Sequence, residues 1–368
     1  MKYYIIAGEA SGDLHGSNLI KELKLLDKDA DIRCWGGDLM REAGGTLVKH
    51  YKDLAFMGFV EVLMNLRTIL KNIAFCKEDI DAYKPDVLVL IDYPGFNLRI
   101  AEWGKARGYK IAFYISPQVW AWKESRVKKM KQYIDKMLVI LPFEKDYYKD
   151  KWHWDVEYVG HPLVKVIDNY KKQSTGHPHD REIVALLPGS RKQEILKKLP
   201  IMLEVSRHFE NYQFVVAKAP GQEDSFYEPL LAPYNNVTSV RGKTYDLLLE
   251  STAALVTSGT ATLETALFGV PEVVCYKGSN ISYQIAKRLI KVKYISLVNL
   301  IMDKLVVKEL IQDDLTVDNL VSELKNLLEN PERKQQLQKD YAALKQLLSG
   351  GGDASATAAR SIYDFVKS

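Results

Sequence analysis

The stretch that decides the fold is IVALLPGSR, residues 183–191, where an apolar run is followed by Pro-Gly-Ser and then by a helix-like pattern. A second stretch of the same kind, AALVTSGTATLE, occupies residues 253–264. Each predicts a β-strand that turns directly into an α-helix. Such a turn leaves backbone N–H groups free at the positive end of the helix dipole, and these groups can hold a phosphate.

The residues at the two turns suit a nucleotide diphosphate. Ser190 and Arg191 place a hydroxyl and a permanent cation at the first helix start, and Gly259 and Thr260 open the second helix. Glu264 follows in the first turns of that helix, where its carboxylate suits ribose hydroxyls better than phosphate. The two stretches together predict a nucleotide-diphosphate site in the second half of the chain.

Strand-like apolar runs alternate with helix-like segments along the whole chain. Several runs are apolar throughout, as expected for strands buried on both faces of a parallel sheet. The alternation predicts an α/β protein with two Rossmann-like, doubly wound domains that face each other across a cleft. The expected strands lie near residues 3–7, 31–35, 86–91, 110–115, 136–141, 157–159, 183–187, 213–217, 236–240, 253–256 and 272–276.

One polar stretch, from Asn169 to Asp180, interrupts this alternation and is the best linker candidate. We therefore expect an N-terminal domain over residues 1–168 and a C-terminal domain over residues 181–350. Three glycines followed by Asp353, a good N-cap residue, predict a last helix. Residues 353–368 are expected to pack back on the N-terminal domain.

Composition excludes several classes of protein. With 368 residues, 47% of them hydrophobic, the chain can form two cores. A formal charge of +4 is too weak to indicate nucleic-acid binding but suits an anionic substrate or membrane surface. The three cysteines are widely spaced, which argues against a disulfide framework or a zinc site and suits a reducing cytoplasm. We expect neither a signal peptide nor a membrane-spanning helix.

Nine short motifs occur in one order along nearly the full length of the chain. They are GEASGD (8–13), DYPGFN (92–97), SPQVWAW (116–122), LPFE (141–144), GHP (160–162), LPGSR (187–191), SGTATLE (258–264), SLVNL (296–300) and KEL (308–310). The set resembles the lipid-A-disaccharide synthase family, bacterial glycosyltransferases of the two-Rossmann (GT-B) type. Val298 stands where the resemblance leads us to expect proline.

The resemblance implies a reaction as well as a fold. Members of the family join UDP-2,3-diacylglucosamine to 2,3-diacylglucosamine 1-phosphate, which gives a β-1,6-linked disaccharide and UDP. A β-linked product from an α-linked sugar nucleotide requires inversion at C1, and one displacement needs one general base. No cofactor is expected.

Asp92 is the expected base, because it directly follows the apolar run VLVLI at 87–91. This position is the carboxyl end of a buried parallel strand, where doubly wound folds bind ligands. The alternative is that Asp92 only caps the segment from Phe96 onward.

Glu9, Ser11 and Gln118 are the residues expected to contact the acceptor. Glu9, Ser11 and Asp13 lie in the first strand-to-helix loop, where they could equally cap a helix expected from about His15 to Leu26. The spacing of the glycines in this loop does not match a dinucleotide-binding fingerprint.

By resemblance alone, Asn299 and Glu309 are added to the nucleotide site. No metal is expected. Asp29-Ala30-Asp31 has the DxD form that binds metal in the other large class of glycosyltransferases, but it precedes a strand and reads as a solvated turn. The seven histidines show no metal-ligand spacing.

The stretch from Leu54 to Phe75 is unusually apolar. Part of it must belong to the core, but the surplus predicts a membrane-surface or acyl-chain site. Basic runs at Arg126 to Lys131 and Lys287 to Lys293 support this interpretation. We expect a cytoplasmic protein that is peripheral to the inner membrane. Homodimer formation is left open.

Two other functions compete with this prediction. A GT-B enzyme such as a UDP-N-acetylglucosamine 2-epimerase would share the UDP-binding half but would need no apolar acceptor surface. A non-enzymatic nucleotide-sugar-binding protein would share the two-lobed form. A dehydrogenase is a distant third, because no GxGxxG stands at the proper distance before an acidic residue.

Overall fold

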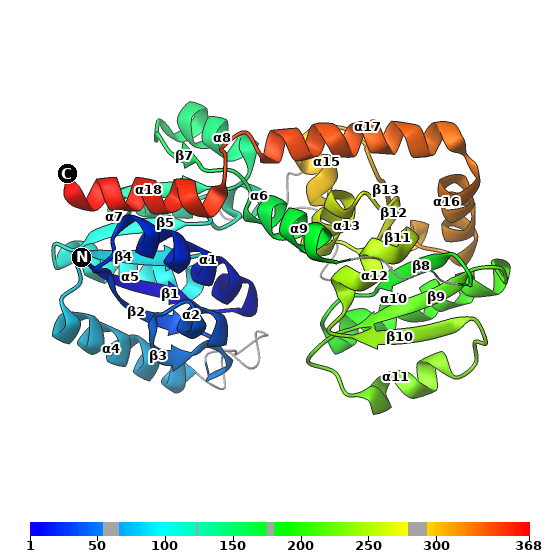
Figure 1. The fold of residues 1–368 in the computed structure, drawn as a ribbon, viewed down its shortest axis with the longest axis horizontal. Coiled ribbons are helices and arrows are strands. Elements are labelled where there is room, and N and C mark those ends of the chain that lie inside the picture. The colour runs from blue at the N-terminus through cyan, green and yellow to red at the C-terminus, as the bar shows by residue number, and fades with distance from the viewer. Residues whose placement is uncertain (54–65, 123, 175–179, 279–292) are drawn as a thin grey trace. The chain divides into compact units, whose positions relative to one another are not determined.

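The computed structural model describes residues 1–53, 66–122, 124–174, 180–278 and 293–368 (Figure 1). The chain forms two compact units. Unit 1 comprises Met1–Pro162 and Leu348–Ser368, and unit 2 comprises Leu163–Leu347. Each unit contains one β-sheet whose described strands all pair in parallel. The prediction of two parallel-sheet α/β domains is therefore confirmed.

Unit 1 contains a seven-stranded sheet in the order β3-β2-β1-β4-β5-β6-β7. The order reverses direction between β1 and β4, which makes their carboxyl ends the topological switch point of the sheet. The strands are β1 (Lys2–Ala7), β2 (Asp31–Gly36), β3 (Thr46–His50), β4 (Val87–Ile91), β5 (Lys110–Tyr114), β6 (Lys136–Val139) and β7 (Glu157–Tyr158). The helices are α1 (Ala10–Leu26), α2 (Asp38–Glu42), α4 (Leu66–Tyr83), α5 (Pro94–Ala106), α6 (Val119–Trp122), α7 (Arg126–Tyr133), α8 (Pro142–Trp152) and α18 (Ala354–Lys367).

Unit 2 contains a six-stranded sheet in the order β10-β9-β8-β11-β12-β13, with its switch point between β8 and β11. The strands are β8 (Ile183–Leu187), β9 (Gln213–Lys218), β10 (Val237–Arg241), β11 (Ser251–Thr257), β12 (Glu272–Tyr276) and β13 (Lys308–Ile311). The helices are α9 (Pro162–Gln173), α10 (Lys192–Val205), α11 (Asp224–Leu231), α12 (Thr244–Glu250), α13 (Thr260–Phe268), α15 (Leu297–Met302), α16 (Val317–Glu329) and α17 (Pro331–Leu348). Short 3₁₀ segments lie at Tyr51–Asp53, Ser206–His208 and Gln312–Asp314.

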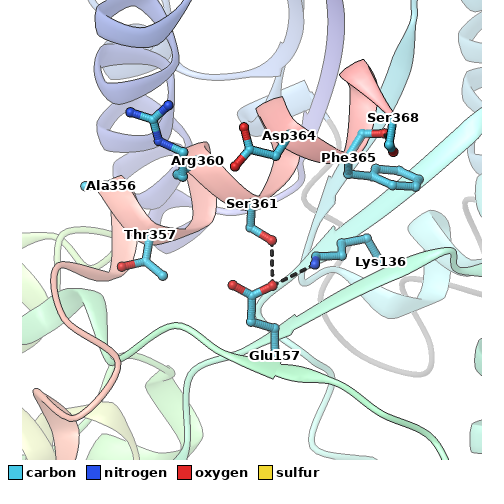
Figure 2. A pocket seen from close by; sticks show the side chains of 9 residues that line it. All are labelled: Lys136, Glu157, Ala356, Thr357, Arg360, Ser361, Asp364, Phe365 and Ser368. Carbon is cyan, nitrogen blue, oxygen red and sulfur yellow. Dashed lines mark hydrogen bonds and ion pairs between the residues drawn. The ribbon is translucent and has the colours of Figure 1, made fainter.

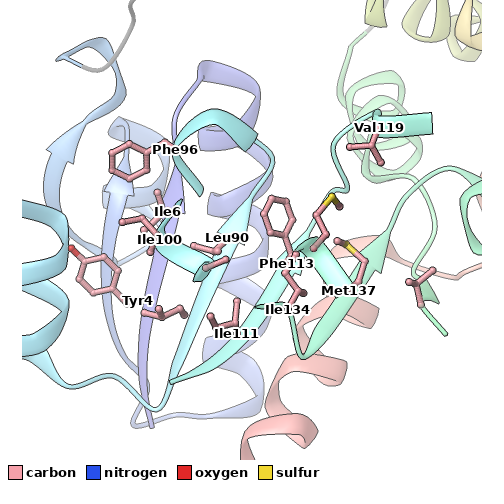
Figure 3. Close-up of a cluster of buried hydrophobic side chains, with 14 of the residues drawn as sticks. Tyr4, Ile6, Leu90, Phe96, Ile100, Ile111, Phe113, Val119, Ile134 and Met137 are labelled. Carbon is pink, nitrogen blue, oxygen red and sulfur yellow. The ribbon is translucent and has the colours of Figure 1, made fainter. Parts of the chain in front are cut away.

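Both faces of the unit 1 sheet are buried. Alternate strand residues such as Tyr4, Ile6 and Leu90 form one core cluster with side chains of α4, α5 and α7 (Figure 3). The intervening residues Tyr3 and Ile5 point to the opposite face and are also fully buried. Because helices cover both faces, the loops at the strand ends are the parts of the sheet that a ligand can reach.

Four elements differ from the sequence-based expectation: two strands were not predicted, and two helices have other bounds. Strands β3 and β13 were not predicted, because both are partly exposed edge strands without a continuous apolar run. Helix α1 begins at Ala10, five residues earlier than expected, since Ser11, Gly12 and Asp13 have low helix propensity. Helix α9 continues to Gln173, so the first five residues of the expected linker are helical.

The last helix, α18, lies within unit 1 and begins with its predicted N-cap. The Asp353 carboxylate accepts a hydrogen bond from the Ala356 N–H at 3.4 Å, and α18 packs against α1. Ser361 Oγ donates to Glu157 Oε2 at 2.6 Å, and Lys136 Nζ lies 2.7 Å from the same oxygen (Figure 2). The helix is thereby tied to β6 and β7 at the edge of the sheet.

Candidate functional site

Three predicted acceptor-site segments follow neighbouring strands of unit 1. Glu9 and Ser11 lie after β1, Asp92 directly follows β4, and Gln118 comes four residues after β5. These strands are adjacent and parallel, so their carboxyl ends share one edge of the sheet. Glu9, Ser11 and Gln118 are exposed there. The fold thus brings the predicted segments to the same edge, although their roles stay predictions.

The chain after β4 has an unusual backbone. Asp92 and Tyr93 have φ angles of +44° and +48°, in the left-handed region that non-glycine residues rarely adopt. The Asp92 N–H donates to the Tyr114 carbonyl oxygen at 3.1 Å, which ties this turn to β5. A Cβ atom at Gly8 would overlap the Tyr93 ring, so the first loop and this turn pack directly against each other.

The buried Asn97 side chain holds this turn through hydrogen bonds to its backbone. Its Nδ2 donates to the carbonyl oxygens of Asp92 at 2.8 Å and Ile91 at 3.2 Å, and its side chain is fully buried. Asn97 was part of a quoted motif, but the sequence reasoning gave it no role. Its local sequence, an amide five residues after a candidate base, does not by itself indicate this contact.

Burial and, to a smaller extent, the nearby Glu9 carboxylate together raise the pKa of Asp92 to about 6, although the Tyr93 backbone N–H opposes the shift. A carboxyl group with a pKa near the working pH can both accept and release a proton, which is the property of a general base. Perturbed pKa values of this kind cluster at functional sites.

Glu144 is a second carboxyl group at this edge of the sheet, and the sequence reasoning assigned it no role. Oε2 accepts from the Leu141 N–H at 3.0 Å, and Oε1 accepts from Trp120 Nε1 at 3.2 Å. Burial raises its pKa to about 8, with a smaller contribution from Asp92. Glu144 therefore ties the start of α8 to α6, the helix that directly follows Gln118.

Asp13 has a structural role. Its carboxylate accepts hydrogen bonds from the N–H groups of Gly37 at 2.8 Å, Met40 at 3.0 Å and Leu39 at 3.2 Å. These donors are the free N–H groups at the start of α2. Asp13 thus caps α2, whereas the sequence left open whether it would cap its own helix or contact the acceptor.

The two predicted phosphate turns lie side by side in unit 2, because β8 and β11 are neighbouring parallel strands. Gly189 has a φ of +109° and Gly259 a φ of +145°, so glycine is required at both turns. Neither α10 nor α13 has a side-chain N-cap, and Ser190, Arg191 and Thr260 are exposed. The helix starts therefore offer uncapped N–H groups to an anion.

Two side chains complete this arrangement. Arg191 Nη1 lies 3.4 Å from Glu194 Oε1, one turn along α10. Glu264 accepts a hydrogen bond from the Tyr245 hydroxyl at 2.8 Å, and burial raises its pKa. Tyr245, on α12, was missed by the sequence reasoning, because nothing in its local sequence marks it.

Asn299 and Glu309 use their polar atoms within the fold. Asn299 Oδ1 accepts from the N–H groups of Val306 and Val307 at 2.8 and 2.9 Å, and its Nδ2 donates to Glu309 Oε1 at 2.8 Å. Glu309 also accepts from the Ile295 and Ser296 N–H groups. Asn299 and Glu309 therefore hold the segment before α15 in place. Their contact with the nucleotide stays a prediction.

Much of the apolar stretch, residues 54–65, lies outside the described residues, as do residues 287–292 of the second basic run. In α4, Leu70 and Phe75 are 51% and 46% exposed, whereas Ile73, Cys76 and Ile80 are buried. Within the described part of the chain, no helix combines the length and hydrophobicity needed to cross a bilayer. The described residues also contain no group of three or more metal-ligating side chains.

Sequence comparison relates the chain to one family over nearly its full length. The family model described as lipid-A-disaccharide synthetase matches residues 3–361. A lipid-A-disaccharide synthase from Geobacter metallireducens is 39% identical, over 95% of this chain and 93% of the relative. Lipid-A-disaccharide synthase 1 from Legionella pneumophila (strain Lens) is 37% identical, over 98% and 96%.

Solved structures share the fold at low sequence identity. A UDP-GlcNAc 2-epimerase from Neisseria meningitidis, solved with UDP-GlcNAc, aligns with a TM-score of 0.68 at 12% identity and covers 100% of both chains. The calicheamicin glycosyltransferase CalG4 aligns with a TM-score of 0.64 at 14% identity, over 100% of this chain and 98% of the other. At such identities the likeness concerns the fold alone.

Proposed function

Because the chain belongs to the lipid-A-disaccharide synthetase family, we propose that it joins UDP-2,3-diacylglucosamine to 2,3-diacylglucosamine 1-phosphate. The products are the β-1,6-linked disaccharide 1-phosphate and UDP. The observation that carries the proposal is the full-length similarity to synthases at 37–39% identity. The 2-epimerase alternative is not favoured, since the epimerase shares only the fold, at 12% identity.

In the proposed mechanism Asp92 is the general base. The acceptor 6-oxygen attacks C1 of the donor sugar while its proton passes to the Asp92 carboxylate. The bond between C1 and the β-phosphate oxygen breaks, and UDP leaves with the bonding electrons. The half-buried position of Asp92 at the switch point of the sheet and its pKa of about 6 support this role. Glu9, Ser11 and Gln118, at the same edge of the sheet, are proposed to contact the acceptor.

Unit 2 is proposed to bind UDP. The uncapped starts of α10 and α13 support this assignment, because negative charge grows on the leaving diphosphate and fixed N–H donors stabilise it. Ser190 and Arg191 would serve one phosphate turn, and Gly259 and Thr260 the other. Glu264 is proposed to bind the ribose, while Asn299 and Glu309 support the site. No metal or cofactor takes part in this proposal.

The acyl chains of both substrates make a membrane the natural source of the acceptor. We propose that the protein is cytoplasmic and binds the inner-membrane surface peripherally. The exposed Leu70 and Phe75 on α4 and the basic residues of α7 support this interpretation. The oligomeric state is not part of the proposal, and analytical ultracentrifugation would measure it.

Mass spectrometry of the products tests the reaction. The purified protein is incubated with the UDP-diacylglucosamine donor and the 1-phosphate acceptor, with and without EDTA. We expect the tetraacylated disaccharide 1-phosphate and UDP in both conditions, formed about 10²–10⁴-fold more slowly with Asp92→Ala. Epimerisation of UDP-N-acetylglucosamine, without disaccharide formation, would contradict the proposal. Binding of both substrates without turnover would instead favour a nucleotide-sugar-binding protein.

A further inference from the structure

Lys198 is a buried lysine beside the candidate nucleotide site. It lies on α10, about two turns after Arg191, and is only 3% exposed. Its Nζ donates a hydrogen bond to Thr257 Oγ1. Thr257 is the last residue of β11 and directly precedes the Ser258-Gly259 turn. Lys198 thus connects the helix behind the first phosphate turn to the strand that leads into the second.

The ammonium group lies directly beneath the Gly189 turn. A Cβ atom at Gly189 would lie 3.6 Å from Lys198 Nζ, 3.4 Å from Thr257 Cγ2 and 3.1 Å from Glu194 Oε2. The side chains of Lys198, Thr257 and Glu194 therefore gather on the inner side of this turn. Because Gly189 has no side chain, only the backbone of the turn separates these three side chains from the N–H groups that it offers to an anion.

The charges of this cluster do not balance. Glu194 is the shared partner of two cations, with Arg191 Nη1 at 3.4 Å and Lys198 Nζ at 4.0 Å. Cys275 is also close, but burial raises its thiol pKa to about 12, so it is neutral. Among the described residues, the three N–H donors of Lys198 make one hydrogen bond, to Thr257. One positive charge is left without a counter-charge.

A buried cation is costly unless a negative charge compensates it. Burial lowers the pKa of Lys198, and the Glu194 carboxylate acts in the opposite direction. An anion at the two phosphate turns would supply the missing charge. In a partly buried site, charges several ångströms apart interact more strongly than in bulk water.

We propose that Lys198 is a second cation of the nucleotide site, which positions both phosphate turns and stabilises the diphosphate through the Gly189 turn. This inference rests on the proposed function, because it assigns a role to Lys198 only at a site that binds UDP. Lys198 acts as a positioning residue, since the turn stands between its ammonium group and the ligand. The alternative is a purely structural role, in which the Lys198–Thr257 hydrogen bond joins α10 to β11 and the positive charge has no effect on ligand binding.

Isothermal titration with UDP, UMP and uridine separates these two roles. For Lys198→Gln we expect UDP to bind about tenfold more weakly, UMP to lose less affinity, and uridine to bind as to the wild-type protein. Lys198→Arg should restore most of the UDP affinity. Lys197→Gln, which removes an exposed charge from the adjacent position of the same helix, is the matched control and should leave all three affinities unchanged.

Lys198→Met separates an effect of the charge from a folding defect, since methionine fills a similar volume in the interior without a charge. We expect an equal or higher melting temperature for this variant together with weaker UDP binding. A lower melting temperature with UDP affinity unchanged would overturn the inference and leave the purely structural role. An equal loss of affinity for UDP, UMP and uridine would also overturn it. Failure of the wild-type protein to bind UDP would instead refute the proposed function.

Discussion

Asn97 Nδ2 donates a hydrogen bond to the Asp92 carbonyl oxygen over 2.8 Å, so one buried amide supports the backbone from which the candidate base projects. Both Asp92 and Tyr93 are in the left-handed region. Such conformations cost roughly 1–3 kcal/mol each and persist only where the surroundings enforce them. Asn97 is part of that enforcement, together with the packing of Tyr93 on Gly8.

We expect Asn97→Ala to lower the free energy of unfolding by about 1–3 kcal/mol, because buried carbonyl oxygens lose their donor. Turnover should also fall, since the turn can relax and move Asp92. The affinity for UDP should not change. Urea unfolding, steady-state kinetics and titration with UDP measure the three quantities. Arg99→Ala, an exposed change on the same helix, is the control. Unchanged stability and turnover in Asn97→Ala would contradict this role.

Asp92 predicts a specific pH dependence. Its pKa of about 6 means that the base is increasingly protonated, and therefore inactive, as the pH falls through 6. We expect kcat/KM, which reports the free enzyme, to fall about tenfold for each pH unit below 6. Asp92→Asn should lower turnover about 10²–10⁴-fold and remove this acid limb. A flat wild-type profile between pH 5 and 7 would exclude Asp92 as the base.

Glu144 should make the stability of the protein depend on pH. Burial raises its pKa from 4.5 to about 8 in the folded protein. The contribution of the protonated Glu144 to the free energy of unfolding is therefore fully present below pH 4.5 and is lost as the pH rises through about 8. We expect urea unfolding between pH 5 and 8 to show a decline that is smaller in Glu144→Gln, by up to roughly 1.4 kcal/mol per pH unit.

Other buried carboxyl groups, such as Glu272, titrate in both proteins and cancel in this comparison. The measured quantity is the difference between the two pH slopes. Identical slopes for wild type and Glu144→Gln would show that Glu144 has an ordinary pKa in the folded protein.

The fold could be predicted from the sequence wherever burial is uniform. Runs such as VLVLI at 87–91 are apolar throughout because both faces of a parallel strand are covered, and these strands were found. The edge strands β3 and β13 were not found, since one side of each meets solvent and their sequences carry no continuous apolar signal. The start of α1 was misplaced because small polar residues there favour a loop locally.

The site was predictable only in part. Asp92 and the two phosphate turns could be named because their chemistry follows from their position after a strand. The supporting residues Asn97, Glu144 and Lys198 could not be named from the sequence. Glu144 and Lys198 contact residues that are distant in sequence, and Asn97 acts through a buried contact with the nearby backbone. Local patterns in a single sequence do not reveal which helix packs over which turn.

Gly259 gives a direct test of the second phosphate turn. Its φ of +145° and ψ of −163° lie in a region that essentially only glycine adopts, so Gly259→Ala should cost roughly 1–3 kcal/mol. Apart from its chain neighbours, no atom of the described residues lies within 4 Å of a Cβ placed there, so the methyl group would project away from the described part of the fold at the helix start. We expect UDP affinity to fall at least about tenfold.

Titration with UDP and thermal melting check this expectation. Gly95→Ala is the matched control, because a Cβ there also meets no other part of the described chain within 4 Å and its φ is ordinary. Gly95→Ala should leave UDP affinity unchanged. Equal UDP affinity in the wild-type protein and Gly259→Ala would remove the second turn from the nucleotide site.

Gly351 tests how α18 is held in unit 1. A Cβ atom at this position would overlap the backbone of Gly160 and Val159, which cannot move aside as a side chain can. The His161 N–H donates to the Leu348 carbonyl oxygen at 2.9 Å beside this contact. We therefore expect Gly351→Ala to separate the two segments and to lower the melting temperature of unit 1 by several degrees.

Hydrogen exchange locates the effect. Amides of α18 and of the neighbouring β5 and β6 should exchange faster in Gly351→Ala, since α18 packs on these strands. Amides of β8 and β11 in unit 2 should keep their protection, and UDP should bind as before. Gly221→Ala is the control, because a Cβ at that position meets none of the residues that the structure describes within 4 Å, its chain neighbours aside. If Gly351→Ala melted and exchanged like the wild-type protein, the glycine contact could not be what holds α18 on unit 1.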